Sequence, residues 1–158
     1  MRAVSFAFLA GIGSLALSAC GTGQPTVGDT VRSQYDPSLM VYAASRGGVP
    51  VEIRGQAFSA TQASVDATVT ESLSRATGSY RVPFSTRPAA ATQDAYRVVM
   101  ALNPAKNAPV HRICSSDIGS TGVSGEKVRI AAALCASDQA VTRVSGQVAG
   151  ATSHDSDA

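Results

Sequence analysis

The chain has 158 residues and a formal net charge of +2, and only 15% of its residues are charged. Its 13 lysines and arginines are spread along the sequence, whereas a nucleic-acid-binding domain gathers basic residues on one face. The composition therefore argues against a nucleic-acid partner, and the length suits one domain with a hydrophobic core.

The N-terminal residues have the three parts of a secretory signal. Met1-Arg2 supplies a positive charge, residues 3–17 form an apolar run, and small residues then precede a cysteine. The run is shorter than the roughly 20 apolar residues that span a membrane. We therefore expect residues 1–19 to direct export and then to be removed.

The four residues Leu17-Ser18-Ala19-Cys20 resemble the lipobox of bacterial lipoproteins, in which an aliphatic residue and two small residues precede a cysteine. The resemblance covers only the signal region. It implies that the Cys20 thiol receives a diacylglyceryl group, that the chain is cut before Cys20, and that the new amine is acylated, typically with palmitate. Two or more acyl chains anchor a protein stably in a membrane. The alternative is an ordinary signal peptide with a chance cysteine at the cleavage point.

The residue after the cysteine is Gly21. In bacterial lipoproteins an aspartate there favours the inner membrane, so the resemblance implies an outer-membrane anchor with the domain facing the periplasm. Residues 20–33 are rich in Gly, Pro, Thr and Ser, which predicts a lipidated N-terminus followed by a flexible tether. A single domain is then expected over residues 34–150.

The first elements of this domain read as a hairpin. Residues 38–45 and residues 49–55 both alternate apolar and polar side chains, which is typical of half-buried strands. Arg46-Gly47-Gly48 lies between them and is a turn signal. The pattern therefore predicts two antiparallel strands joined by a short turn.

Residues 58–76 change to a helical period. Val65, Val69 and Leu73 recur every four residues, and Ser59 and Gln62 have the spacing of a capping box. This pattern predicts an amphipathic helix whose apolar stripe packs on a sheet.

The next three segments are read from their prolines and apolar runs. Residues 80–91 contain two prolines and are predicted to be extended or looped. Residues 95–102 are almost continuously apolar, which is typical of a central strand. Residues 103–126 are rich in Gly, Ser, Asn and Pro and are predicted to form a long loop.

The C-terminal part completes the predicted fold. Residues 127–136 are a strand candidate, although their alanines also allow a helix, and residues 140–148 favour a short helix or irregular segment leading into a last strand. Residues 151–158 are polar and are expected to be a disordered tail. The resulting β-β-α-β-β order predicts an α+β domain, a small antiparallel sheet with one amphipathic helix packed on one face.

Two cysteines, Cys114 and Cys135, remain once Cys20 is assigned to the lipid. An even pair in an oxidising compartment predicts one disulfide, which would stabilise the fold by roughly 3 kcal/mol. The alternatives are two buried free thiols or a redox pair. The chain has no Cys-x-x-Cys motif, and His111 adds too few ligands for a metal site.

The sequence predicts no catalytic residue and no cofactor site. Cys114 and His111 are a candidate nucleophile pair, but they lie three residues apart in a loop without a third orienting group. The glycine-rich residues 119–125 lack the Gly-Lys-Ser/Thr end of a phosphate-binding loop and fit a loop tip. Six arginines fit either contacts with an anionic lipid surface or acidic polymer, or solvated faces: Arg46, Arg54, Arg75, Arg81, Arg87 and Arg97.

These features favour a non-enzymatic envelope module that is held on a membrane by its N-terminal lipid and has an envelope protein as a partner. The alternative is an enzyme acting on envelope polymers, with a site that forms only in three dimensions. A cleft with converging carboxylates or a free Cys–His pair would favour the enzyme. An apolar groove or an exposed sheet edge would favour the binding module.

Overall fold

The computed structural model describes residues 26–32, 36–87, 96–122 and 127–149. The predicted signal peptide, the lipobox with Cys20 and the predicted tail lie outside the described residues. The described elements follow one another along the chain as β1 (Thr26–Arg32), α1 (Ser38–Ser45), β2 (Val49–Arg54), α2 (Gln62–Ala76), η1 (Gly78–Tyr80), β3 (Phe84–Ser85), β4 (Tyr96–Leu102), η3 (Val110–Arg112), β5 (Lys127–Ala136) and β6 (Gln139–Ala149).

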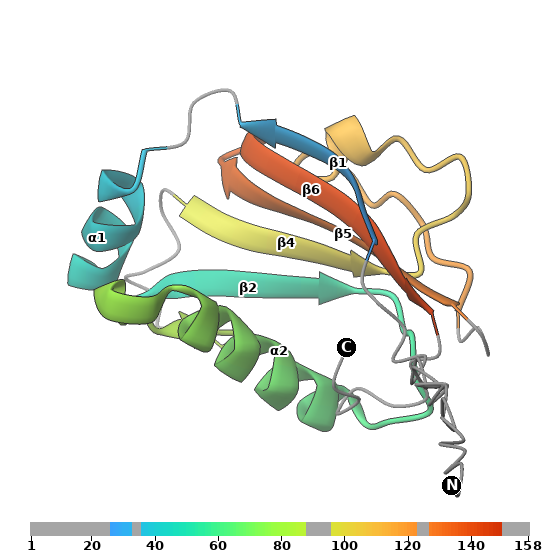
Figure 1. Cartoon of the computed structure of the whole chain (residues 1–158), viewed down its shortest axis with the longest axis horizontal. Helices are drawn as coiled ribbons and strands as arrows, with labels where there is room; N and C mark the ends of the chain where they lie inside the picture. The colour runs from blue at the N-terminus through green and yellow to red at the C-terminus, as the bar shows by residue number, and fades with distance from the viewer. Residues whose placement is uncertain (1–25, 33–35, 88–95, 123–126, 150–158) are drawn as a thin grey trace, which may run out of the picture.

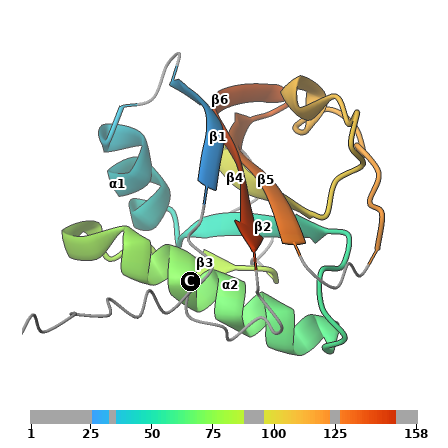
Figure 2. The ribbon, with the colours of Figure 1, turned by 45° about the vertical axis from the view of Figure 1, so that its right-hand side comes forward.

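The strands form one mixed sheet in the order β1-β6-β5-β4-β2-β3 (Figure 1, with β3 labelled in Figure 2). Strands β4, β5, β6 and β1 pair antiparallel, whereas β2 is parallel to both of its neighbours, β3 and β4. The α+β class is confirmed, but the prediction of a purely antiparallel sheet is wrong. The reason is that the chain leaves β2 through α2, and such a helical crossover returns it in the same direction.

The two faces of the sheet carry different cores. On β4 and β5 alternate side chains point to opposite sides, as the two-residue period of a strand requires. One set packs against α1 and α2 and includes Val98, Leu102, Val128 and Leu134. The other set packs under the loop between β4 and β5 and includes Val99, Ala101, Ala131, Ala133 and Cys135. Figure 2 shows the helices and this loop on opposite sides of the sheet.

Helix α2 and strands β2, β4 and β5 confirm the corresponding sequence predictions. The helix begins at Gln62, and its N-cap is Thr61 rather than Ser59, because the Thr61 hydroxyl accepts the amide hydrogen bond of Ser64 and caps the first turn. Its apolar stripe packs on the sheet through Val65, as expected. Among the described residues, no helix is long and apolar enough to cross a membrane.

The prediction of a strand over residues 38–45 is wrong, and so is the hairpin that depended on it. This segment is helix α1, and its buried residues Met40 and Ala43 are three positions apart, as one helix face requires. Asp36 helps to start the helix because its Oδ1 accepts a 2.8 Å hydrogen bond from the Ser38 amide, which lowers the pKa of Asp36. Eight residues are too few for the apolar pattern to separate a period of 2 from a period of 3.6.

Two further predictions are corrected by strand pairing. The predicted tether, residues 20–33, includes strand β1, which pairs with β6 from Thr26 opposite Gln147 to Arg32 opposite Thr142. The domain therefore begins at or before Thr26 and not at residue 34. The segment predicted as a short helix or irregular chain, residues 140–148, lies within β6, because its β-branched residues find a full-length partner in β5.

Candidate functional site

The predicted disulfide is present. Cys114, in the loop after η3, is bonded to Cys135 of β5, with a Cα–Cα distance of 5.7 Å. Both cysteines are buried beneath the loop, whereas His111 on η3 is exposed. Cys114 is therefore not a free thiolate, and the Cys–His nucleophile pair is not formed.

Two of the six candidate arginines hold the same loop on the sheet. Arg54 of β2 donates from Nη1 to the carbonyls of Ile113 (2.9 Å) and Ser116 (2.7 Å). Arg97 of β4 donates from Nη2 to the carbonyl of Cys114 at 2.6 Å. These charge-assisted hydrogen bonds satisfy carbonyls that follow the short η3 helix. The two arginines therefore have a structural role in holding this loop.

The carboxylates in this region also accept hydrogen bonds from neighbouring side chains. Glu52 accepts a 2.7 Å hydrogen bond from Arg54 Nε, and its other oxygen lies 3.8 Å from Arg97 Nε. Glu52 and Asp66 both line a shallow hollow beside β2, but Asp66 accepts a 2.7 Å hydrogen bond from Gln62 Nε2. The hollow thus does not offer the pair of free facing carboxylates that glycan hydrolysis requires.

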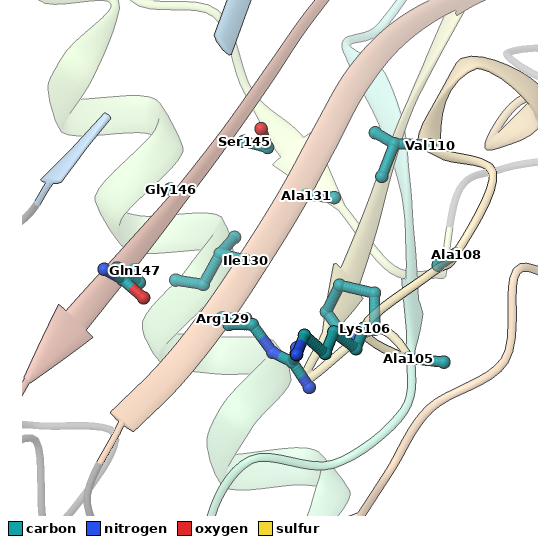
Figure 3. A pocket seen from close by; sticks show the side chains of 11 residues that line it. Ala105, Lys106, Ala108, Val110, Arg129, Ile130, Ala131, Ser145, Gly146 and Gln147 are labelled. Atoms are coloured by element: carbon teal, nitrogen blue, oxygen red, sulfur yellow. The ribbon is translucent and has the colours of Figure 1, made fainter. Parts of the chain in front are cut away.

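A different cavity lies on the loop-covered face of the sheet, between residues 104–110 and strands β5 and β6 (Figure 3). It has a volume of about 280 Å³. Ala131 and Gly146 lie on its strand side, and Ala108 and Val110 lie on its loop side. Because these residues are small, room is left between the loop and the sheet, which makes an apolar groove.

Charged and polar side chains line the same cavity. Lys106 comes from the loop, Arg129 from β5, and Ser145 and Gln147 from β6 (Figure 3). Within the described part of the chain, none of the residues that line the cavity is acidic, and neither Lys106 nor Arg129 forms an ion pair. We call this cavity the cationic groove. Two basic groups without a counter-charge favour occupation by an anion.

Asn103 fixes the backbone from which Arg129 enters the groove. Its backbone amide donates to the Arg129 carbonyl (2.7 Å), and its side-chain Oδ1 accepts from the Arg129 backbone amide (2.9 Å). Its Nδ2 donates to the Gly122 carbonyl at 2.8 Å. Asn103 is 1% exposed and has a φ of +47°, a conformation that asparagine tolerates better than most residues. The end of β4 is thereby locked to the start of β5.

We predict that Asn103→Ala destabilises the domain by about 2 kcal/mol, because two backbone groups lose their side-chain partners. Thermal or urea unfolding followed by circular dichroism measures the change. Asn107→Ala is the matched control, since Asn107 is exposed in the same loop and its loss is expected to leave stability within about 0.5 kcal/mol. Equal effects of the two substitutions would contradict the role given to Asn103.

Sequence reasoning did not single out Lys106 or Arg129. They lie 23 positions apart, one in a loop and one in a strand, and no motif connects them. The described residues contain no cluster of three or more side chains suited to holding a metal ion. No family model, curated protein or solved structure matches the chain. The geometry of the groove is therefore the main guide to function.

Proposed function

We propose that this chain is a lipid-anchored protein of the cell envelope whose domain binds a ligand in the periplasm, with its acyl chains in the outer membrane. The observation that carries the binding role is the cationic groove, in which Lys106 and Arg129 share an apolar cavity whose described lining residues include none that is acidic. Small-molecule sites typically combine apolar walls with a few polar or charged groups in this way.

Two features support the compartment. The residues Leu17-Ser18-Ala19-Cys20 match the lipobox pattern at all four positions. The disulfide between Cys114 and Cys135 is of a kind that persists in oxidising compartments such as the periplasm. Together they give each of the three cysteines a role in an exported, membrane-held protein.

A binding role accounts for the described chemistry better than the enzymatic alternative. Cys114 is oxidised, and Glu52 and Asp66 are both engaged by neighbouring side chains. Among the described residues, Cys114 and these two carboxylates are thus already paired, which supports the binding role over the enzymatic one.

Mass spectrometry of the protein extracted from bacterial membranes tests the anchor. We expect a mature chain that begins at Cys20 and carries a diacylglyceryl group and an amide-linked acyl chain. Cys20→Ala is expected to abolish acylation and cleavage at this position. A mature N-terminus without lipid, produced from the unaltered sequence, would overturn the anchor.

Thermal unfolding tests the binding role separately. A ligand that binds only the native state raises the melting temperature, and the rise increases with the logarithm of the ligand concentration once this exceeds the dissociation constant. Among small anions and matched neutral compounds, we expect inorganic phosphate and glycerol phosphate to stabilise the unaltered protein. The double variant Lys106→Ala/Arg129→Ala should lose this stabilisation. If no anion distinguishes the two proteins, the groove is not a binding site.

A further inference from the structure

We infer that the cationic groove binds the phosphate of an anionic phospholipid headgroup, in the same membrane that holds the lipid on Cys20. This inference rests on the proposed function, since it assigns a ligand class to the proposed binding site. Three observations support it: the position of the groove in the sheet, the length of chain between the groove and Cys20, and the chemistry of the lining side chains.

The first observation is a row of paired residues across three strands. Thr26 at the start of β1 is opposite Gln147 of β6, and Gln147 is opposite Arg129 of β5. Neighbouring strands are about 4.8 Å apart, so the backbone of Arg129 lies about 10 Å from that of Thr26. The groove is therefore at the end of the sheet where β1 begins.

The second observation is the short chain between the fold and the anchor. Only five residues separate Cys20 from Thr26, so even a fully extended chain places Thr26 at most about 21 Å from Cys20. Strand β1 then runs away from this end, and α1 lies beyond its far end (Figure 1). Lipid on Cys20 thus keeps the groove end near the membrane, and α1 with its exposed Val41 and Tyr42 farther from it.

The third observation is the fit of the groove to a phosphate ester. The Arg129 guanidinium can donate two parallel hydrogen bonds to phosphate oxygens, and the Lys106 ammonium adds a second positive charge. Ser145 and Gln147 supply further polar groups on the β6 side. A cavity of about 280 Å³ holds a phosphate and part of a glycerol unit, while the acyl chains remain outside. None of the described lining residues is acidic, so none of them repels an anion in the groove.

Vesicle co-sedimentation tests the inference with the mature chain from residue 20, in which Cys20→Ser prevents acylation. This chain contains every described residue. We expect it to bind vesicles that contain phosphatidylglycerol and phosphatidylcholine, and to bind pure phosphatidylcholine vesicles much more weakly. Each basic residue near an anionic surface contributes about a fivefold change in affinity, so Lys106→Ala/Arg129→Ala should weaken binding about 25-fold.

The matched control is Arg46→Ala/Arg75→Ala, which removes the same charge from exposed positions in α2 and after α1. It is expected to change vesicle binding less than about threefold. Lys106→Ala alone is a second test variant, because Lys106 is exposed and we expect its loss to leave the fold intact. Circular dichroism establishes that each variant is folded. A loss of binding in the control as large as in the groove variant would show general surface attraction and would overturn the inference.

Two other results would also overturn it, and they separate it from the proposed function. If glycerol phosphate stabilises the protein through Lys106 and Arg129 while vesicles do not bind, the groove takes a soluble anion and the binding role stands. If an acidic peptide stabilises the protein and phosphate does not, the ligand is a protein segment. If Cys20 carries no lipid in membranes, the proposed anchor is wrong. The vesicle measurement does not depend on that result, because it uses protein without acyl chains.

Discussion

Gly55→Ala is expected to destabilise the domain by about 3 kcal/mol or more, one of the two largest effects predicted for this protein. A Cβ atom at this position would lie 2.4 Å from the Leu102 carbonyl oxygen and 2.5 Å from Ser120 Oγ. Gly55 also has a φ of +77°, which is unfavourable for residues with a side chain. Because the closest atom belongs to the backbone, the overlap can be relieved only by moving the end of β4.

Gly122→Ala is the matched control for this prediction. Gly122 has the same φ of +77°, but an added Cβ meets no atom within 4 Å. Gly122→Ala is therefore destabilised only by the placement of an alanine at a positive φ, which costs about 1 kcal/mol. Urea unfolding of both variants isolates the steric contribution of Gly55. Equal destabilisation would mean that the chain leaving β2 does not pass as closely over β4 as described.

The second large effect is expected from removing the disulfide. Cys114→Ala/Cys135→Ala should destabilise the domain by about 3 kcal/mol, because the unfolded chain gains the freedom of a loop closed by residues 21 positions apart. For a domain of this size that loss lowers the melting temperature by about 10 °C. Thermal unfolding followed by circular dichroism, with Cys20→Ser in both proteins, measures the difference.

Reductant provides the control for the disulfide. It should lower the melting temperature of the protein that retains Cys114 and Cys135 and leave the double alanine variant unchanged. Thiol quantitation in denaturant without reductant should find no free cysteine in the former. Two titratable thiols in freshly purified protein from the periplasm would contradict the bond.

The same substitution should also affect the groove. The disulfide, Arg54 and Arg97 together hold residues 113–116 on the sheet, and residues 104–110 of the same loop form one wall of the groove. A ligand that binds the groove is therefore expected to lose affinity in the disulfide-free variant, even at temperatures where that variant remains folded.

Local sequence signals were sufficient where an element was long and periodic. The spacing of Val65, Val69 and Leu73 predicted α2, the apolar run of β4 predicted a central strand, and the run of β5 was a strand candidate that also allowed a helix. Cysteine parity and compartment predicted the pairing of Cys114 with Cys135. These signals work because each depends on a repeated side-chain pattern or on covalent chemistry, and neither requires knowledge of a distant partner.

The local sequence signals failed where contacts with another segment of the chain decided the structure. The apolar residues of α1 fit two periods, and burial of Met40 and Ala43 selected the helical one. Residues 26–32 resemble a linker in composition, yet they form β1 because β6 offers a free edge. Hydrogen bonds between strands join residues far apart in sequence, so a single segment does not reveal them.

The sequence by itself determined the α+β class, the helix α2, the central strands and the cysteine pairing, and it supplied the lipobox on which the envelope proposal depends. Only the tertiary structure decided which basic residues are free. Arg54 and Arg97 donate hydrogen bonds to loop carbonyls, whereas Lys106 and Arg129 line one cavity in which no described residue supplies a counter-charge. The physical reason is that the interactions of a charged side chain depend on its neighbours in space. The antiparallel pairing of β4, β5 and β6 sets those neighbours.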